Sequence, residues 1–311
     1  MAFKISNANN FPPLTPEQLQ GYLQRIEFVR NESPLQPSLS VLNQILKCHA
    51  STIPYENTTV FLGQGTGSLN VTEVYTKMAS DGRAGYCYQN NILLIASLRA
   101  IGFNVSPSAV RNMFWNAELK VWDFFPFIHM VALVFFEAGT TFLADMGQHR
   151  LPFAMRIHDG ETACSAAGEA VQIRKAGVIN EEDYFLCVKR AFWARLADGV
   201  DPHGDLFSPQ FCFSLQRNRP TDFDVPNFYV SKSPCHRFSD TLIISMMTET
   251  GGRRNMVNNI FRRREAQPDG GQRETKVVIT SMEEFLRIMK EEFCLTLTQH
   301  EVDVVRSMKW F

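Results

Sequence analysis

One stretch of the sequence decides how the chain is interpreted: Gly82-Arg83-Ala84-Gly85-Tyr86-Cys87-Tyr88-Gln89-Asn90-Asn91. It predicts a turn that runs into a helix, because apolar residues recur at helical spacing from Ile92 and Gly102 supplies a stop. Cys87 is therefore expected at, or within one turn of, a helix N-terminus. Unpaired N–H groups and the helix dipole favour an anion there, and a cysteine is nucleophilic only as its thiolate.

Downstream of this helix, two apolar stretches predict a β-hairpin. The ranges His129 to Phe136 and Thr140 to Asp145 are typical of two strands that a short turn separates. Antiparallel pairing around that turn would place His129 close to Asp145. A nucleophilic cysteine needs a base, and the base needs an orienting acceptor. We therefore hypothesise that Cys87, His129 and Asp145 form a catalytic triad.

The same residues also have a simpler interpretation, as packing residues. A histidine that precedes a run of apolar residues is commonly a satisfied core histidine, and cysteines are common in apolar cores. Cys87 is the only cysteine expected at a helix N-terminus; the others are Cys48, Cys164, Cys187, Cys212, Cys235 and Cys294. Their odd total and the lack of a Cys-x-x-Cys pair predict reduced thiols, with no disulfide framework and no metal site.

The composition excludes several classes of protein. The 311 residues include 31 Lys plus Arg and 32 Asp plus Glu, a net charge of −1, which argues against nucleic-acid and membrane-surface binding. The longest apolar run, Met130 to Phe136, is too short to span a membrane. The N-terminus has no apolar signal-peptide core. We expect a cytoplasmic protein with neither nucleic-acid nor membrane partners.

Hydrophobic patterning divides the chain into a helical part and strand-rich parts. It predicts a helix that starts at Thr15–Pro16 and extends toward Val29, and another from Ser38 to about His49. After Gly102 short strands follow, interrupted by a loop-rich stretch from about 160 to 204. Strands and a final helix are expected in the last third, at Phe228–Val230, Thr241–Met246, Lys276–Ile279 and Ser281–Phe293.

The segment that begins at Arg83 resembles the Arg-Gly-Gly-x-Cys-x-(Glu/Gln)-x-Asn segment of the arylamine N-acetyltransferase family. His129–Val134 is similar to the histidine-containing strand of that family, and Leu143–Gly147 to its Val-Asp-x-Gly-Phe-Gly sequence. The likeness covers most of the chain in the right order, since it also includes Ile53–Asn57, Asp224–Tyr229 and Ser233–Pro234.

This resemblance implies a role for each member of the predicted site. Cys87 would be the acyl-accepting nucleophile, His129 the base and Asp145 its orienter. The residues just before the histidine would contact the two substrates, with Phe125 and Pro126 toward coenzyme A, and Phe127 and Ile128 toward the amine. Tyr229 and Cys235 match positions that line the coenzyme A site in animal members of the family.

The resemblance also implies an α+β fold with a cysteine-protease-like catalytic core. The expected parts are a helical bundle at 1–103 that carries the nucleophile, a β-barrel at 104–215 and an α/β lid at 216–311. Residues at about 148–204 would form an insertion that is longer than in bacterial members. Ala84 replaces the first glycine of the family segment, and Gln148-His149 replaces the usual Phe-Gly after Gly147. None of these departures touches the triad.

The expected activity is ping-pong transfer of a small acyl group from acyl-CoA, through a Cys87 thioester, to a small aromatic amine. No permanently bound cofactor is required. A papain-like hydrolase or amidase would use the same triad but admit water, and a non-catalytic binding relative would keep only the cleft. The altered Gln148-His149 is the one feature that favours the binding relative.

Acetyl-CoA is the expected donor, with propionyl-CoA also acceptable. Some fungal relatives use malonyl-CoA, whose carboxylate would need a cation if it were buried. The segment from Phe124 to Ile128 contains no cation. Arg83 precedes the nucleophile, but the resemblance implies a structural role for it, and Arg111 and His149 could reach the cleft only through loops. A malonyl donor therefore stays the alternative.

Overall fold

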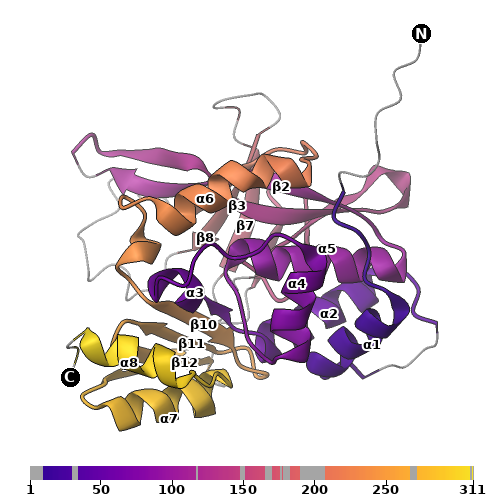
Figure 1. Ribbon diagram of the computed structural model, residues 1–311. Helices are drawn as coiled ribbons and strands as arrows, with labels where there is room; N and C mark the ends of the chain where they lie inside the picture. Colours follow the sequence, from indigo (N-terminus) through magenta and orange to yellow (C-terminus); the bar gives the residue numbers. More distant parts are fainter. Residues whose placement is uncertain are drawn as a thin grey trace.

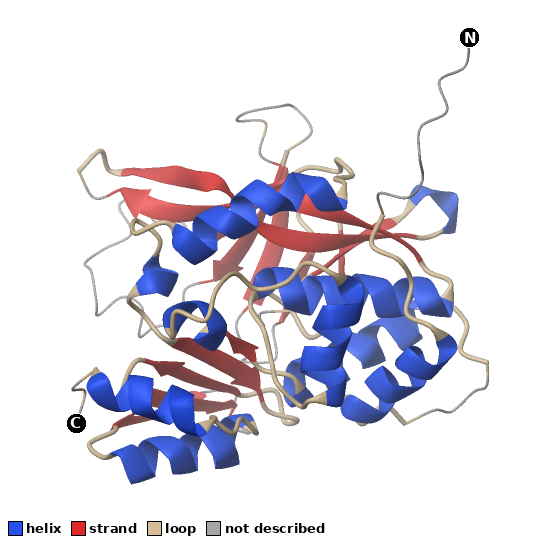
Figure 2. Cartoon of the chain, in the orientation of Figure 1, coloured by secondary structure: helices blue, strands red, loops and turns tan. Residues whose placement is uncertain are grey.

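The computed structural model describes residues 10–29, 34–116, 118–147, 151–164, 170–175, 177, 183–189, 207–266, 272–308 and 310. It has an α+β fold in which a group of helices, an eight-stranded sheet and a smaller C-terminal sheet pack together (Figure 1). The N-terminal helices gather on one side of the long strands, and the C-terminal sheet lies beside these helices (Figure 2).

The N-terminal part is helical, as its hydrophobic spacing predicts. Thr15 and Gln18 form a capping box at the first helix, and Ser38 caps the second by accepting a hydrogen bond from Val41 N. The first helix stops earlier than predicted, because Glu27 adopts a positive φ, and Val29 is exposed. The helices are α1 Pro16–Arg25, α2 Leu39–Thr52, α3 Thr58–Phe61, α4 Val71–Tyr75, a π-helical turn Thr76–Ser80, and α5 Cys87–Ile101.

The helix α5 lies at the centre of the molecule and begins at Cys87, as the sequence predicts. Almost every side chain along it is buried, which explains why it is apolar on all sides rather than amphipathic. Gly102 ends the helix with a φ of 104°, a left-handed conformation that glycine adopts without strain.

The larger sheet is antiparallel and barrel-like, with the strand order β5-β4-β3-β2-β9-β8-β7-β6. The predicted hairpin is confirmed in β3 and β4, which pair with Ala132 opposite Ala144 and are joined by the 3-10 turn Glu137–Gly139. The strands are β2 Asn104–Asn116, β3 Val121–Phe135, β4 Thr141–Ala144, β5 Met155–Arg156, β6 Thr162–Cys164, β7 Ala170–Lys175, β8 Tyr184–Lys189 and β9 Phe207–Phe213.

The prediction of a loop-rich stretch at 160–204 was wrong for its described part. Strands β6, β7 and β8 lie there and extend the sheet from β9. The alternating burial of Val171 and Ile173 in β7, which their neighbours do not share, is the period-two signal of a strand. Residues 190–206 lie outside the described residues.

The smaller sheet has the order β1-β10-β11-β12-β13 and carries α7 and α8 alongside (Figure 1). Thr241–Met246 and Lys276–Ile279 overlap strands of this sheet, and Ser281 caps the predicted last helix. Helix α8 was not predicted, although Thr298 and Glu301 form a capping box at its start. The elements are β1 Tyr55–Glu56, β10 Ile243–Met247, β11 Arg253–Val257, β12 Ile260–Ala266, β13 Gln272–Val278, α7 Met282–Phe293 and α8 Gln299–Ser307.

The strand predicted at Phe228–Val230 was wrong, because these residues belong to helix α6, Asp224–Lys232. The 3-10 turn Pro220–Phe223 leads into this helix. Its buried residues are Asn227, Val230 and Ser231, whose i, i+3, i+4 spacing is helical. Phe228 points away from this buried side and is exposed.

The three predicted segments are not separate bodies. Strand β1 comes from the helical segment but pairs with β10 of the C-terminal sheet, with Tyr55 opposite Ser245. One buried hydrophobic cluster includes residues of the helical part, of β3 and of the C-terminal part, such as Leu94, Met130 and Ile244. The boundaries at 103 and 215 stay a prediction.

Candidate active site

Cys87 is the first residue of α5, and its side chain is buried. The preceding residue, Tyr86, is the N-cap but makes no side-chain cap. Its hydroxyl instead donates to Asn227 Oδ1 at 2.5 Å and accepts from the Gly67 N–H at 3.1 Å. The start of α5 is thereby fixed to α6 and to the loop before α4.

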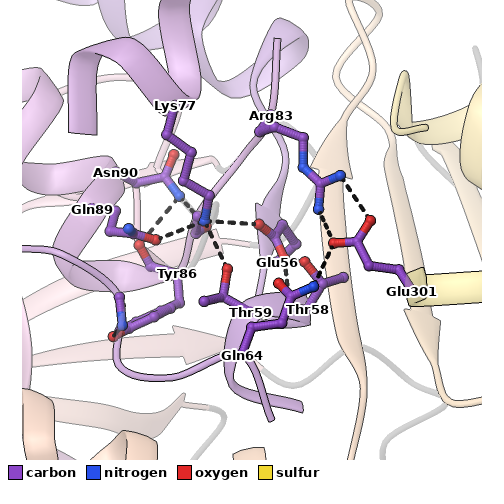
Figure 3. A network of polar contacts seen from close by, with 12 residues as sticks. Glu56, Thr58, Thr59, Gln64, Lys77, Arg83, Tyr86, Gln89, Asn90 and Glu301 are labelled. Carbon is purple, nitrogen blue, oxygen red and sulfur yellow. Dashed lines mark hydrogen bonds and ion pairs between the residues drawn. The ribbon is translucent and has the colours of Figure 1, made fainter. Parts of the chain in front are cut away.

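Two polar networks hold the segment that leads to Cys87 (Figure 3). Lys77 Nζ donates to one oxygen each of Glu56, Thr59 and Gln89. Arg83 makes two hydrogen bonds to the buried carboxylate of Glu301 in α8, at 2.6 and 3.0 Å. Burial opposes the ionisation of Glu301, but Arg83 outweighs it and the pKa of Glu301 falls to about 2. The Arg83 side chain therefore connects the nucleophile segment to the C-terminal helix.

His129 and Asp145 meet at the end of the β3–β4 hairpin. The His129 Nε2–H donates to Asp145 Oδ2 at 2.9 Å, and both side chains are buried. The other carboxylate oxygen, Asp145 Oδ1, accepts from the Gly147 N–H at 2.7 Å. Continuation of the observed register beyond Ala144 places Gly147 opposite His129. Both carboxylate oxygens of Asp145 thus accept hydrogen bonds, and His129 is the titratable group that contacts the carboxylate here.

Asn91 is a positioning residue that the sequence analysis did not identify. Its Nδ2 donates to Asp145 Oδ1 at 3.0 Å and to the Met130 carbonyl at 2.7 Å. Its Oδ1 accepts from the Met146 N–H at 3.0 Å. The signal was present, because Asn91 follows Cys87 by four residues and so lies on the same face of α5, one turn later.

Gly147 allows the thiol and the imidazole to lie next to each other. A Cβ added at Gly147 would lie 2.4 Å from His129 Cε1 and 2.7 Å from Cys87 Cβ, both far inside van der Waals contact. No larger residue fits there without moving one of the two side chains. The glycine is needed for this close approach and not for an unusual turn.

The electrostatics of the pair favour the charged forms of both partners. Burial disfavours an imidazolium, but the charge and hydrogen bond of Asp145, with a further contribution from Cys87, raise the pKa of His129 to about 10. Burial likewise opposes ionisation of Asp145, yet His129, Asn91 and Gly147 N–H lower its pKa. His129 is therefore a cation at neutral pH beside the Cys87 thiol.

A cavity of about 480 Å³ opens over this group of residues, within the usual range for small-molecule sites. Cys87 and His129 line it together with residues from several other elements. Among these are Tyr55 of β1, Phe125 of β3, Gln210 of β9, Ser245 of β10, and Cys235, which follows α6.

Only some of the residues that were predicted to contact the substrates line this cavity. Phe125, Ile128 and Cys235 are on its wall, whereas Pro126, Phe127 and Tyr229 are not among its lining residues. Phe127 is partly exposed and lies 3.9 Å below the guanidinium of Arg111. Tyr229 lies against His236, which is on the wall. Gln148 and His149 lie outside the described residues.

Two arginines on the wall, Arg237 and Arg253, were missed by the sequence analysis. No local signal marks them, since β11 reaches the cavity only through the pairing of the C-terminal sheet. Within the described ranges, no group of three or more His, Cys, Asp or Glu residues could hold a metal ion. In the same part of the chain, no helix is long and apolar enough to cross a bilayer.

Comparisons with known proteins agree on one family. The model of the N-acetyltransferase family matches residues 38–302, most of the chain. The chain belongs to the arylamine N-acetyltransferase family. It is an N-acetyltransferase-like acyltransferase enzyme, as the sequence predicted.

Relatives and solved structures of this family resemble the chain over most of its length. An N-malonyltransferase from Gibberella moniliformis is 23% identical over 92% of this chain and 90% of its own. The arylamine N-acetyltransferase of Mycolicibacterium smegmatis is 26% identical over 74% of this chain and 77% of its own. The arylamine N-acetyltransferase structure from Nocardia farcinica has a TM-score of 0.80, with 20% identity and 99% of each chain covered. That structural likeness confirms the predicted fold.

Proposed function

We propose that this enzyme transfers an acyl group from an acyl-CoA to a small aromatic amine through a thioester on Cys87. The observation that supports this most directly is the buried His129–Asp145 pair, joined at 2.9 Å, whose histidine lines the same cavity as Cys87. A nucleophile, a base and an orienting carboxylate in that arrangement are the parts that covalent acyl transfer needs.

The first half-reaction would form the acyl-enzyme. The Cys87 sulfur attacks the thioester carbonyl, and the cationic His129 stabilises negative charge on that sulfur beforehand. As the tetrahedral intermediate collapses, the bond to coenzyme A breaks and His129 supplies the proton to the departing thiolate. Asp145 keeps the imidazole in the required orientation and stabilises its cation.

The second half-reaction would transfer the acyl group to the amine. An aromatic amine is mostly neutral at pH 7, so its nitrogen attacks the thioester without prior deprotonation. His129, neutral after the first step, accepts the proton as the carbon–sulfur bond breaks. Phe125 and Ile128 line the cavity beside Cys87 and supply the apolar wall that a flat amine would contact and that excludes water.

A coenzyme A donor is supported by relatives of the same fold, one of which, from Mycobacterium marinum, was solved in complex with CoA. The sequence favours acetyl, while relatives named N-malonyltransferase support malonyl as the alternative. The seven cysteines are all free thiols, which supports the proposed reducing, cytoplasmic compartment.

Mass spectrometry of the intact protein tests this proposal. Incubation with acetyl-CoA or malonyl-CoA should add one acyl group to the wild type and none to Cys87→Ser. Cys235→Ser is the matched control, because it removes the other thiol of the same cavity and should still be acylated. Addition of an arylamine should discharge the adduct to an N-acyl product.

Two results would contradict the proposal. Acylation of Cys87→Ser would assign the nucleophile elsewhere. Rapid hydrolysis of amides or peptides without coenzyme A, with no acyl adduct from any acyl-CoA, would favour the cysteine hydrolase.

A further inference from the structure

The residues directly before the nucleophile belong to no helix and to no extended strand. Between the π-helical turn that ends at Ser80 and the start of α5 at Cys87, Gly85 makes an isolated β-bridge to Tyr55. Side-chain contacts must therefore fix much of this stretch. Its path sets where the Cys87 side chain begins, and so how the thiol meets His129.

Glu301 of α8 holds this stretch through Arg83. The guanidinium donates to one carboxylate oxygen at 2.6 Å and to the other at 3.0 Å, an arrangement that fixes direction as well as distance. The same guanidinium donates to the Thr296 carbonyl at 3.0 Å, just before α8. The backbone N–H of Arg83 donates to the Lys77 carbonyl, also at 3.0 Å. Arg83 is therefore fixed at its backbone and at the end of its side chain.

A second contact of the same carboxylate leads to Tyr86, the residue before Cys87. Gln64 Nε2 donates to Glu301 Oε1 at 3.2 Å (Figure 3). Gln64 is in the loop that continues to Gly67, whose N–H donates to the Tyr86 hydroxyl at 3.1 Å. A Cβ added at Gly67 would lie 2.7 Å from that hydroxyl, so the loop packs directly on the Tyr86 side chain. One carboxylate thus contacts both segments that hold the start of α5.

Fold stability alone does not account for a charge at this position. The Glu301 side chain is only 2% exposed. A buried ion pair adds little net stability, because taking two charges out of water costs about as much as their attraction returns. Such a pair does impose a defined geometry on the segments that carry it. Glu301 is not among the residues that line the cavity, so its effect on the site must pass through its partners.

We propose that Glu301 is a positioning residue for acyl transfer, which acts through Arg83 and Gln64 to hold Cys87 in the geometry that its attack requires. This inference rests on the proposed acyl transfer through Cys87. Glu301 takes no part in the bond changes, which involve the Cys87 sulfur, the acyl carbon and the proton that His129 transfers. Helix α8 then shapes the active site as well as packing against the C-terminal sheet.

The main test is Glu301→Gln. The amide removes the charge but keeps an oxygen to accept from the Thr298 N–H, which is 2.7 Å from the carboxylate, as glutamine does in a capping box. Single-turnover acylation of Cys87 by acetyl-CoA, followed by mass spectrometry, gives the maximal rate and the half-saturating concentration. The maximal rate should fall by about 100-fold, the loss that a misplacement of about 1 Å causes. The half-saturating concentration should not change, because Glu301 is not on the cavity wall.

Asp303→Asn is the matched control. Asp303 is on the same helix, but its side chain is exposed and makes its ion pair with Arg306 at the surface, at 3.1 Å. Removal of its charge should leave the acylation rate unchanged. An equal loss in both variants would trace the effect to the charge of α8 in general and would overturn the inference.

A double variant separates positioning from stability. Glu301→Gln alone leaves the Arg83 guanidinium without its counter-charge and should destabilise the fold. Arg83→Met combined with Glu301→Gln removes both charges, so its urea midpoint should lie close to that of the wild type. Its acylation should nevertheless be as slow as in Glu301→Gln. This double variant replaces the single one if the single one does not fold.

The outcomes separate this inference from the acyl transfer on which it rests. A wild-type acylation rate in either variant overturns the inference while Cys87 is still acylated. A raised half-saturating concentration with an unchanged maximal rate also overturns it, since Glu301 would then serve binding. Failure of the double variant to fold overturns it as well, because the ion pair would then serve stability. The absence of any acyl adduct on Cys87 in the wild type overturns the acyl transfer itself.

Discussion

Two histidines in the described part of the chain are fully buried, yet their surroundings give them different charges. His49 of α2 lies in the helical part between the Tyr22 hydroxyl and Asn90 Oδ1, each 2.9 Å from one ring nitrogen. Burial lowers its pKa to about 4, although the Asn90 hydrogen bond opposes this. His129 is equally buried, but its pKa rises to about 10 because Asp145 is charged. Burial alone therefore does not set the charge of a histidine; the charge of its hydrogen-bond partner does.

Consecutive residues of α5 serve the two histidines. Asn90 accepts from the His49 Nε2–H, while Asn91 donates to Asp145, the partner of His129. A helix directs adjacent side chains about 100° apart, so one turn of α5 supports both a neutral structural site and a charged candidate site. The helix that begins with the nucleophile thereby couples the two regions.

Replacing the charged partner should have the largest effect. Asp145→Asn keeps the shape of the site but removes the carboxylate that stabilises the imidazolium, as His49 already illustrates. We expect kcat for acyl transfer to fall by about 10⁴-fold, the loss that the same change causes in a serine triad. Steady-state kinetics with a saturating acyl-CoA measures this.

The pH profile gives a second readout of the same variant. The raised pKa of His129 contributes stability that is fully present below about pH 6.5 and is lost as pH rises through about 10. The wild-type ion pair should therefore persist up to about pH 10, and the residual activity of Asp145→Asn should decline at a lower pH. Turnover like that of the wild type would show that Asp145 does not orient the base.

The sequence could predict His129 and Asp145 as partners but gave no basis for those of His49. A hairpin with a short turn fixes its own register, so the Asp145 position follows from local patterning alone. Tyr22 and Asn90 reach His49 from two other helices, and only tertiary packing brings them together. Arg253 was unpredictable for the same reason, since its place depends on the pairing of β1 with β10 and of β10 with β11.

A neutral replacement of His49 should remove its pH dependence. The depressed pKa means that the unfolded chain binds a proton between about pH 6.5 and about pH 4 while the folded protein does not, so stability rises with pH in that window. The free energy of unfolding of the wild type is therefore lower by about 3 kcal/mol at the lower end of this pH window. Glutamine has an amide that can both accept and donate a hydrogen bond but does not titrate. On acidification the free energy of unfolding of His49→Gln should therefore fall by about that much less than that of the wild type. Urea denaturation at several pH values measures it; parallel curves for both proteins would contradict it.

Moving His129 without changing its hydrogen-bond partner should lower kcat less than Asp145→Asn does. In Gly147→Ala the new methyl group overlaps His129 Cε1 and Cys87 Cβ, so one side chain must move. A misplacement of this size costs about 100-fold in rate. We expect kcat to fall by that factor while the pKa of His129 stays raised, since Asp145 is unchanged. Kinetics combined with an NMR titration of the imidazole tests both parts, and an unchanged kcat would mean that the backbone at Gly147 yields instead.

The smallest effect should come from the neutral partner of His49. Tyr22→Phe removes the hydroxyl that donates to His49 Nδ1 at 2.9 Å and leaves that buried nitrogen without this donor. The free energy of unfolding should fall by about 1 kcal/mol, because a neutral hydrogen bond is lost and the ring keeps its packing. Acyl transfer should be unaffected, since the Tyr22 ring belongs to the helical core and not to the cavity wall. Urea denaturation and steady-state kinetics together decide this. A large loss of activity with little loss of stability would show that the α5 helix transmits changes from the neutral histidine to the charged one.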